Sequence, residues 1–337
     1  MAANTKKITY IAIVSIVMAL LAASYFRKGG QSVTFSRALM GTLVQVTLMD
    51  GDEAGYEAAA DAAFDEISRL EKLLSSYDPA SDVSLIAKAA GQSAVKVSPE
   101  VVEVVVRGLE ISRLSGGAFD PTVGALGRAW GYSGEKGLVP PADEVAKLLP
   151  LVDYTAVVVD EKNSTVMLSK KGMVLNLGGV AKGFIVGRAI DKLKAAGMKR
   201  GIIHAGGDMT VFQTGEGEPF LVGIQHPREK KLLGEVRVKS GAVATSGDYE
   251  RFFMKDGVRY HHILDPETGF PAGRSQSATV TSIDPTQADA LSTAAFVMGP
   301  TAGIEMIEKI EGVEGLMVDM NGKVYISTGF EGRVFSN

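Results

Sequence analysis

The sequence predicts an α+β fold, in a single domain that follows an N-terminal hydrophobic segment. Strand-like and helix-like stretches are mixed along the chain, and short strands dominate its second half. No repeat, low-complexity tract or long linker divides residues 31–337. Mixed strands with helices grouped against the sheet form one of the few stable layer arrangements. We therefore expect residues 1–30 to be a signal peptide or membrane anchor with its linker, and residues 31–337 to be one mixed α/β domain.

Composition narrows the class of protein. The chain has 337 residues, of which 46% are hydrophobic, enough for a sizeable buried core. Its formal net charge of −4 argues against a nucleic-acid partner, because nucleic-acid-binding proteins usually carry a basic excess. The chain contains no cysteine, which excludes a disulfide framework, a cysteine nucleophile, a thiolate metal site and a lipid anchor on cysteine.

The N-terminal residues predict export. Lys6 and Lys7 precede an apolar run over Ile8–Phe26, which Arg27 and Lys28 follow. A helix of this length, at a rise of about 1.5 Å per residue, nearly spans a hydrocarbon core of ~30 Å. The run is long for the core of a signal peptide, which favours an uncleaved membrane anchor over a cleaved signal peptide. Either interpretation places the rest of the chain on the extracytoplasmic (periplasmic) side.

Periodicity and end signals predict the elements of the first half. Alternating apolar residues indicate a strand over Thr42–Met49, and a 3.6-residue period indicates a helix over Glu57–Leu74. Ser98 followed by Pro99 is typical of a helix start, and Gly116–Gly117 is typical of a helix end. Three further strands are expected before the middle of the chain: Thr155–Asp160, Thr165–Leu168 and Val174–Leu177.

The second half is expected to begin with a helix over Ala181–Ala196, ended by Gly197. Asp284 with Gln287 three positions later has the form of a capping box, which predicts a helix closing at Gly299–Pro300. A shorter helix is expected over Thr301–Ile310. The expected strands of this half are Gly201–His204, Phe220–Ile224, Glu235–Val238, Ala278–Ser282, Gly315–Asp319 and Lys323–Ser327.

Two stretches could carry metal or phosphate chemistry. Asp289 and Thr293 stand four positions apart on an expected helix, so they share a face and offer hard oxygen ligands suited to Mg²⁺. The same spacing fits a surface aspartate and a threonine bonded to its own helix. Leu177–Gly183 contains paired glycines that would let backbone N–H groups approach an anion, and Lys182 could bind a phosphate. The stretch matches neither a Walker A loop nor a dinucleotide fingerprint, and a plain glycine-rich turn is the alternative.

Other signals are weaker when taken singly. His262 could act as a general base, or could belong to a half-packed histidine pair with His261. Tyr77 could stack on a flat ring or close the end of a helix, and Phe119–Asp120 has the same ambiguity. No Gly-x-Ser-x-Gly or His-Glu-x-x-His motif occurs, so a hydrolase or a metalloprotease of those types is poorly supported.

Taken together and in this order, the motifs resemble those of the ApbE family of FAD:protein FMN transferases. An ordered series of this kind, from about residue 40 to 298, is very hard to obtain by chance. The matching stretches are Met40–Thr42, Leu74–Tyr77, Gly117–Thr122, Gly178–Gly183, His204–Asp208, Ala244–Tyr249, His262–Pro266 with Thr268–Gly269, and Ala288–Thr293.

The resemblance implies a tunnelling-fold-like domain that uses Mg²⁺ to split its substrate FAD. FMN would then be attached through a phosphoester to a threonine or serine of an acceptor flavoprotein, such as an FMN-binding-domain subunit of a membrane redox complex, and AMP would be released. The family pattern implies metal binding by Asp289, Thr293 and the backbone carbonyl of Ala181. Catalytic roles would fall to His262, Asp289 and Lys182, with His262 accepting the acceptor hydroxyl proton. Expected FAD contacts are Met40, Tyr77, Ala118, Phe119, Asp120, Lys182, His262 and Ile263.

Two departures from the family pattern and three alternatives remain open. Members often have aspartate where this chain has Asn176, and many exported members are tethered through a cysteine, whereas here the Ile8–Phe26 run is the expected tether. The same metal site would serve an FAD pyrophosphatase, in which water replaces the acceptor hydroxyl. A flavin-binding protein without turnover is the second alternative. Self-modification at Thr245 is the third, although Ser240–Thr245 lacks the aspartate that leads a flavinylated segment.

Overall fold

The computed structural model describes residues 32–49, 53–131 and 138–335. The predicted membrane anchor, Ile8–Phe26, lies outside these ranges. Within them, no helix combines the length and the apolar character that a membrane crossing requires.

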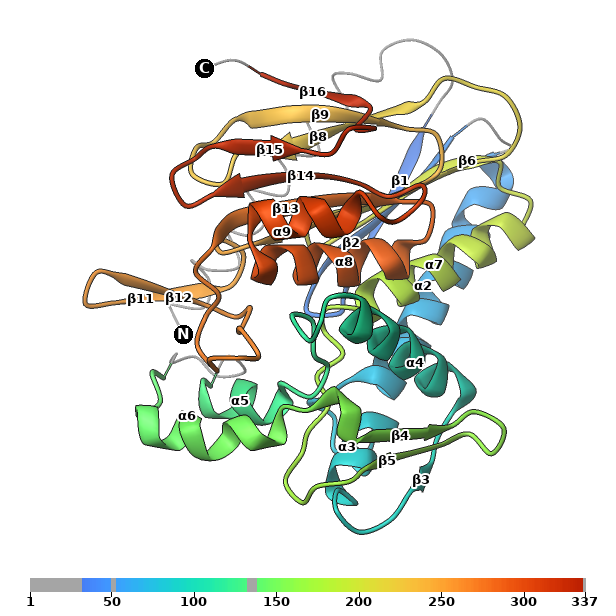
Figure 1. Ribbon diagram of the computed structural model, residues 1–337. Helices are drawn as coiled ribbons and strands as arrows, with labels where there is room; N and C mark the ends of the chain where they lie inside the picture. The colour runs from blue at the N-terminus through green and yellow to red at the C-terminus, as the bar shows by residue number, and fades with distance from the viewer. Residues whose placement is uncertain (1–31, 50–52, 132–137, 336–337) are drawn as a thin grey trace, which may run out of the picture.

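A single antiparallel sheet of eight strands forms the middle of the molecule (Figure 1). Its strands lie in the order β1-β2-β6-β7-β10-β13-β14-β15, and every neighbouring pair is antiparallel. The N-terminal hairpin and the C-terminal third of the chain therefore share one sheet. The strands are β1 (Val33–Leu39), β2 (Thr42–Met49), β6 (Arg200–Ala205), β7 (Asp208–Gln213), β10 (Gly241–Gly247), β13 (Ser275–Ser282), β14 (Glu314–Asp319) and β15 (Val324–Ile326).

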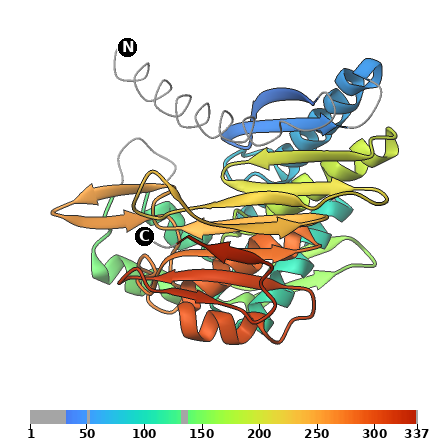
Figure 2. The same cartoon turned by 90° about the horizontal axis from the view of Figure 1, so that it is seen from above.

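Helices cover one face of this sheet, as Figures 1 and 2 show from two directions. Val44, Val46 and Leu48 alternate along β2 and are fully buried towards that helical layer. Such a period of two is what a sheet face packed against helices requires. Four helices pack on the sheet, α2 (Tyr56–Leu74), α7 (Ala181–Ala195), α8 (Pro285–Met298) and α9 (Pro300–Ile307), and α4 (Pro99–Leu114) packs on α8.

A smaller sheet covers the opposite face. Its order is β16-β9-β8, with β8 at Phe220–Gln225, β9 at Leu232–Val238 and β16 at Gly332–Val334. Ile202 and Leu316 of the central sheet share a buried cluster with strands β8 and β9. Both faces of the central sheet are therefore buried, and this explains why β13 is buried at seven of its eight positions although it contains serine and threonine.

A satellite core lies beside the main one and positions the loop after residue 262. Trp130, which follows α5 (Gly124–Ala129), is fully buried, and its indole Nε1 donates to the carbonyl of Gly269 at 2.9 Å. Its ring lies 5.7 Å from that of Tyr260 and 5.6 Å from that of Phe270. Tyr260 belongs to the hairpin of β11 (Phe252–Lys255) and β12 (Val258–His261), which projects from the body of the molecule (Figures 1 and 2).

The remaining elements are short. A third sheet, in the order β3-β5-β4, joins Val95–Lys96, Thr165–Leu168 and Val157–Asp160. The other helices are α3 (Asp82–Lys88), α6 (Ala142–Leu148) and three 3₁₀ turns, η1 (Glu53–Gly55), η2 (Leu149–Leu151) and η3 (Tyr154–Ala156).

Most predicted elements are confirmed, with shifts of a few residues at their ends. The strand predicted over Val174–Leu177 is wrong: only Val174 pairs, in an isolated bridge to Val123, and the backbone N–H of Asn176 donates to Pro121. A short buried apolar run cannot be told from a buried loop by periodicity. The strand predicted from Thr155 begins later, at Val157, because the side chain of Asp153 caps a 3₁₀ turn there.

The predicted capping box before α8 is half formed. The carboxylate of Asp284 accepts from the backbone N–H groups of Thr286 and Gln287, at 2.8 and 3.3 Å. Gln287 does not reach back to the backbone of Asp284. Instead the hydroxyl of Ser282 accepts from the Asp284 N–H at 3.2 Å and donates to Gln287 at 2.8 Å. The N-terminus of α8 is thus fixed by three side chains.

Helices α7 and α8 approach each other closely at Gly183, and this contact predicts a stability difference. A Cβ on Gly183 would overlap the carbonyl of Pro285 and lie 2.9 Å from the Cβ of Asp289. On Gly187, one turn later, a Cβ would lie 3.7 Å from Pro285, which is ordinary contact. We expect Gly183→Ala to lower the free energy of unfolding by about 1–3 kcal/mol, since overpacking outweighs the gain in helix propensity.

Gly187→Ala is the matched control, and we expect it to be neutral or stabilising by up to ~1 kcal/mol. Urea unfolding followed by circular dichroism measures both variants. Equal stability of the two variants would contradict the close packing of α7 on α8.

Candidate functional site

The site is built where the first turn of α7 meets the middle of α8. The backbone N–H of Gly183 donates to Asp289 Oδ2 at 2.9 Å. A Cβ on Gly179 would lie only 3.1 Å from the hydroxyl of Thr293 and 3.1 Å from the ring of Phe119. The absence of side chains at both glycines lets the loop before α7 lie directly against α8. The fold therefore brings together the two motifs that the sequence predicts to cooperate.

Asp289 is a buried carboxylate, with 4% of its surface exposed. Burial raises its pKa above the ordinary value, although the nearby charge of Lys182 acts in the opposite direction. Within the described residues it forms no ion pair. A buried carboxylate that is not paired is costly, so this position favours a bound cation.

The oxygen atoms around Asp289 suit a hard cation. The hydroxyl of Thr293 lies 3.1 Å from that of Ser246, which lies 3.0 Å from that of Ser292. The carbonyl of Ala181 belongs to the first turn of α7. In the part of the chain that the structure describes, no three His, Asp or Glu side chains gather as a metal cluster. A cation here would therefore rely on one carboxylate, hydroxyl and carbonyl oxygens, water and ligand, as Mg²⁺ commonly does.

Lys182 is not free. Its ammonium forms an ion pair with Asp208 at the start of β7, and the other carboxylate oxygen of Asp208 accepts from the Thr245 N–H at 2.9 Å. Although burial opposes it, the attraction of Asp208 and Asp289 raises the pKa of Lys182 above its ordinary value. Lys182 is therefore charged at neutral pH, but its ion pair with Asp208 compensates much of that charge.

The two adjacent histidines have different roles in the fold. His261 is buried, bonds through Nε2 to the carbonyl of Ala272 at 2.8 Å, and lies edge-on to Phe296. His262 holds the carbonyl of Arg251 through its backbone N–H at 3.0 Å and through Nδ1 at 3.3 Å. A carbonyl only accepts, so the proton sits on Nδ1 and leaves Nε2 as an acceptor.

The imidazole of His262 is neutral at physiological pH. Burial and then the charge of Arg251 lower its pKa to about 3. Because the proton sits on Nδ1, Nε2 carries none and is a hydrogen-bond acceptor.

The remaining predicted flavin contacts fall into two groups. Phe119 is buried against the loop before α7, and Ile263 is buried next to His262. Ala118 and Asp120 line a cleft of about 490 Å³ that also includes Tyr154. The carboxylate of Asp120 is engaged by the Thr122 N–H at 2.7 Å, the Thr122 hydroxyl at 2.6 Å and the Tyr154 N–H at 3.0 Å, so it stabilises the cleft wall.

Tyr77 lies apart from the buried group. It follows the C-terminal end of α2, and 69% of its surface is exposed. Its backbone N–H donates to Ser75 Oγ at 3.2 Å, which fixes the chain while leaving the ring accessible. The predicted ring stacking stays a prediction.

Met40 occupies a strained turn. Met40 and Gly41 form the two-residue loop of the β1–β2 hairpin, with φ of 53° and 68°. Positive φ at both positions defines a type I′ turn, which favours Asn-Gly or Asp-Gly. The β11–β12 hairpin has that favoured pair, Asp256–Gly257, with φ of 51° and 78°. A methionine in this position costs stability, which points to a function of its side chain.

Asn176 fixes the turn that leads into the Gly178–Gly183 loop. Its side-chain oxygen accepts from the Gly178 N–H at 3.0 Å, as a carboxylate would. Its own N–H donates to Pro121 at 2.7 Å, which ties this loop to the Phe119–Thr122 segment. These two hydrogen bonds hold the start of the Gly178–Gly183 loop in place.

Sequence reasoning missed three residues of the site: Ser246, Ser292 and Arg251. Ser246 reaches Thr293 across 47 positions of sequence, and Arg251 lies close to Gly41. No local pattern encodes such contacts. The available signals were that Ser246 belongs to the Ala244–Tyr249 motif and Ser292 to the Ala288–Thr293 motif.

Comparisons with known proteins agree with the family resemblance of the sequence. The model of the ApbE family matches residues 40–317, which include every predicted site residue. The chain is 33% identical over 321 residues to the FAD:protein FMN transferase of Treponema pallidum, covering 89% of this chain and 88% of that protein. It is also similar to two solved structures. One is the ApbE protein of Thermotoga maritima, with a TM-score of 0.83, 35% identity and coverage of 88% and 97%; the other is the flavin transferase ApbE of Vibrio cholerae, with a TM-score of 0.78, 26% identity and coverage of 89% and 98%.

The strain at Met40 predicts opposite changes in stability and in binding. We expect Met40→Asn to raise the free energy of unfolding by about 0.5–1 kcal/mol, because asparagine tolerates the left-handed region. If the Met40 side chain contacts flavin, the same variant binds FAD more weakly. Urea unfolding and a titration of flavin fluorescence measure the two effects.

Asp256→Asn is the control for Met40→Asn, since that turn already has a favoured residue. The free energy of unfolding of Asp256→Asn and its affinity for FAD should stay close to those of the unmodified chain. A Met40→Asn variant that is less stable than the unmodified chain would contradict the assignment of strain to Met40.

Proposed function

The chain belongs to the ApbE family, and on this premise we infer that it is an FAD:protein FMN transferase. It cleaves FAD, attaches FMN through a phosphoester to a threonine or serine of an acceptor flavoprotein, and releases AMP. The observation that carries the inference is the meeting of the Gly178–Gly183 loop with Asp289 and Thr293 at the N-terminus of α7. A glycine-rich loop at a helix N-terminus, next to oxygen ligands for a cation, is suited to a pyrophosphate.

We propose Mg²⁺ as the cation of this site. Asp289, Thr293 and the carbonyl of Ala181 would hold it, and the oxygen-only donor set supports that choice. When bound, it would supply positive charge to the pyrophosphate and so favour breakage of the phosphoanhydride. Asp289 contributes the single carboxylate, and the pairing of Lys182 with Asp208 keeps the loop before α7 in place.

His262 is the proposed general base. Its Nε2 would take the proton of the acceptor hydroxyl while that oxygen attacks the phosphorus of the FMN half. A new O–P bond forms as the P–O bond to AMP breaks, and AMP leaves with the bonding electron pair. The carbonyl of Arg251 fixes the ring and leaves Nε2 as an acceptor, and this geometry supports the role. Phosphoryl transfer needs positioning and charge compensation more than covalent catalysis, which fits the absence of a strong nucleophile among the predicted residues.

The proposed flavin contacts divide by exposure. Phe119, Ala118 and Ile263 lie in or beside the buried part of the site, which suits the parts of FAD that must be held still. Met40, which is half-buried, and the exposed ring of Tyr77 are the remaining proposed contacts, and an exposed aromatic ring could stack on the flavin.

The proposals on location and acceptor rest on the sequence alone. We propose that Ile8–Phe26 anchors the protein in the membrane and that the transferase domain works on the extracytoplasmic side. The proposed acceptor is a flavoprotein of the same compartment, such as an FMN-binding-domain subunit of a membrane redox complex.

The transferase activity is tested by mixing the full chain with FAD, MgCl₂ and a candidate acceptor. The intact mass of the acceptor and the AMP released are then measured. We expect an FMN-sized mass gain that disappears with EDTA and in Asp289→Ala, but persists in Asp191→Ala, which removes an exposed carboxylate of the same α7 region. AMP release without an adduct, across several acceptors, would indicate a pyrophosphatase. Flavin binding without either product would indicate a flavin-binding protein.

The role of His262 is tested by His262→Ala. Loss of a positioned general base typically costs about 10²–10⁴-fold in rate, and we expect kcat for transfer to fall within that range at saturating FAD. Because the change removes a proton acceptor and not the metal ligands, Mg²⁺-dependent binding of FAD should remain. A variant that transfers FMN at the full rate would remove His262 from this role.

A further inference from the structure

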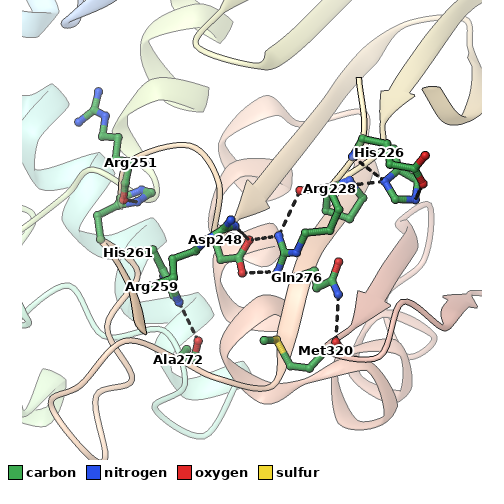
Figure 3. Close-up of polar contacts among 12 residues, drawn as sticks. His226, Arg228, Asp248, Arg251, Arg259, His261, Ala272, Gln276 and Met320 are labelled. Carbon is green, nitrogen blue, oxygen red and sulfur yellow. Dashed lines mark hydrogen bonds and ion pairs between the residues drawn. The ribbon is translucent and has the colours of Figure 1, made fainter. Parts of the chain in front are cut away.

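Three arginines surround the hairpin that leads to His262, and one buried carboxylate takes up two of them (Figure 3). Asp248 has 3% of its surface exposed. Arg228 donates to both of its carboxylate oxygens, at 2.7 and 2.6 Å, and Arg259 donates to one of them at 3.1 Å. This cluster joins the β8–β9 loop to strand β12, so it fixes the base of the hairpin.

Arg251 is the arginine that this cluster leaves out. It is exposed, and within the described ranges its guanidinium forms no ion pair. Figure 3 shows its side chain directed away from Asp248. The backbone of Arg251 nevertheless belongs to the site, because its carbonyl holds both the backbone and the ring of His262.

The guanidinium lies between two parts of the predicted flavin site. Its Nη2 is 3.8 Å from the position that a Cβ on Gly41 would occupy, in the strained Met40–Gly41 turn. Its charge is also felt at the ring of His262. Arg251 is therefore a cation beside the proposed base, on the side of the site away from the Asp248 cluster.

The guanidinium of Arg251 could compensate the negative charge that FAD brings to the site. The pyrophosphate of FAD is a dianion, and further negative charge develops on the leaving phosphate as the bond to AMP breaks. Lys182 is already committed to Asp208, and the buried Asp289 adds another negative charge. A bound divalent cation would offset only part of this total. Transition-state charge in phosphoryl transfer is commonly stabilised by an arginine, whose planar fork matches phosphate oxygens.

We propose that Arg251 is a further catalytic residue, which binds a phosphate oxygen of FAD and stabilises the negative charge of the transition state. The proposal rests on the proposed transferase function and names a residue that binds the phosphates of FAD. The Asp248 cluster acts as its support, since it holds Arg228 and Arg259 away and leaves Arg251 free for substrate.

The test compares three variants of the full chain: Arg251→Met, Arg251→Lys and Lys255→Met. Lys255 is the matched control, because it is an exposed cation at the far end of the same strand β11, next to the turn. For each variant, transfer is followed by the intact mass of the acceptor, and affinities for FAD and for riboflavin are measured by flavin fluorescence. Riboflavin is the probe because it lacks both phosphates.

We expect Arg251→Met to lower kcat/KM for transfer by about 100-fold, and Arg251→Lys to lower it less, because lysine keeps the charge but not the fork. Arg251→Met should also weaken FAD binding while leaving riboflavin binding and the melting temperature unchanged. Two results would overturn the proposal. One is a fall in kcat/KM for Arg251→Met that exceeds the fall for Lys255→Met by less than roughly tenfold. The other is an equal loss of affinity for FAD and for riboflavin. An unmodified chain without any transfer would instead reject the transferase function itself.

Discussion

The close contact between the first turn of α7 and the middle of α8 is the constraint on which the site depends. Gly183 lies so near Asp289 and Pro285 that no side chain fits between the helices, and its N–H bonds the Asp289 carboxylate. That contact sets the Gly178–Gly183 loop against Thr293 and Phe119. Both faces of the central sheet are buried, and α8 cannot move without repacking strands β10 and β13. The contact between α7 and α8 is therefore rigid.

Each buried carboxylate of this region has a different partner, and the differences indicate what each one does. Asp208 is paired with Lys182, and Asp248 is paired with Arg228 and Arg259, so these charges are compensated within the protein. Asp289 has a backbone N–H but no ion pair among the described residues. Burying a charge without a partner is expensive, so the fold retains at Asp289 a position that a cation would stabilise. The opposite case is Arg251, a cation that forms no ion pair with the residues that the structure describes, which suits an anionic substrate.

Local signals in the sequence were enough for much of the fold. The start of α4 at Pro99, the Asp284 cap of α8 and the spacing of Asp289 and Thr293 depend on residues within one or two helical turns, and they were predictable. Strands β1, β7 and β10 were not predicted. The sequence of β10 begins and ends with glycine, and it acquires its strand character from its distant partners β7 and β13. The same reason explains why Ser246 and Arg251 escaped prediction. The ion pair of Lys182 was not predicted either, because its partner, Asp208, lies 26 positions away.

The central claim is that Asp289, Thr293 and Ala181 hold the cation that the reaction needs. Anomalous diffraction from crystals of the protein with FAD and Mn²⁺, a substitute for Mg²⁺ with similar oxygen preference, tests it most directly. The account predicts an anomalous peak in contact with the Asp289 carboxylate, the Thr293 hydroxyl and the Ala181 carbonyl. Active, FAD-loaded protein with no peak at these atoms, or with its peak at other side chains, would contradict it.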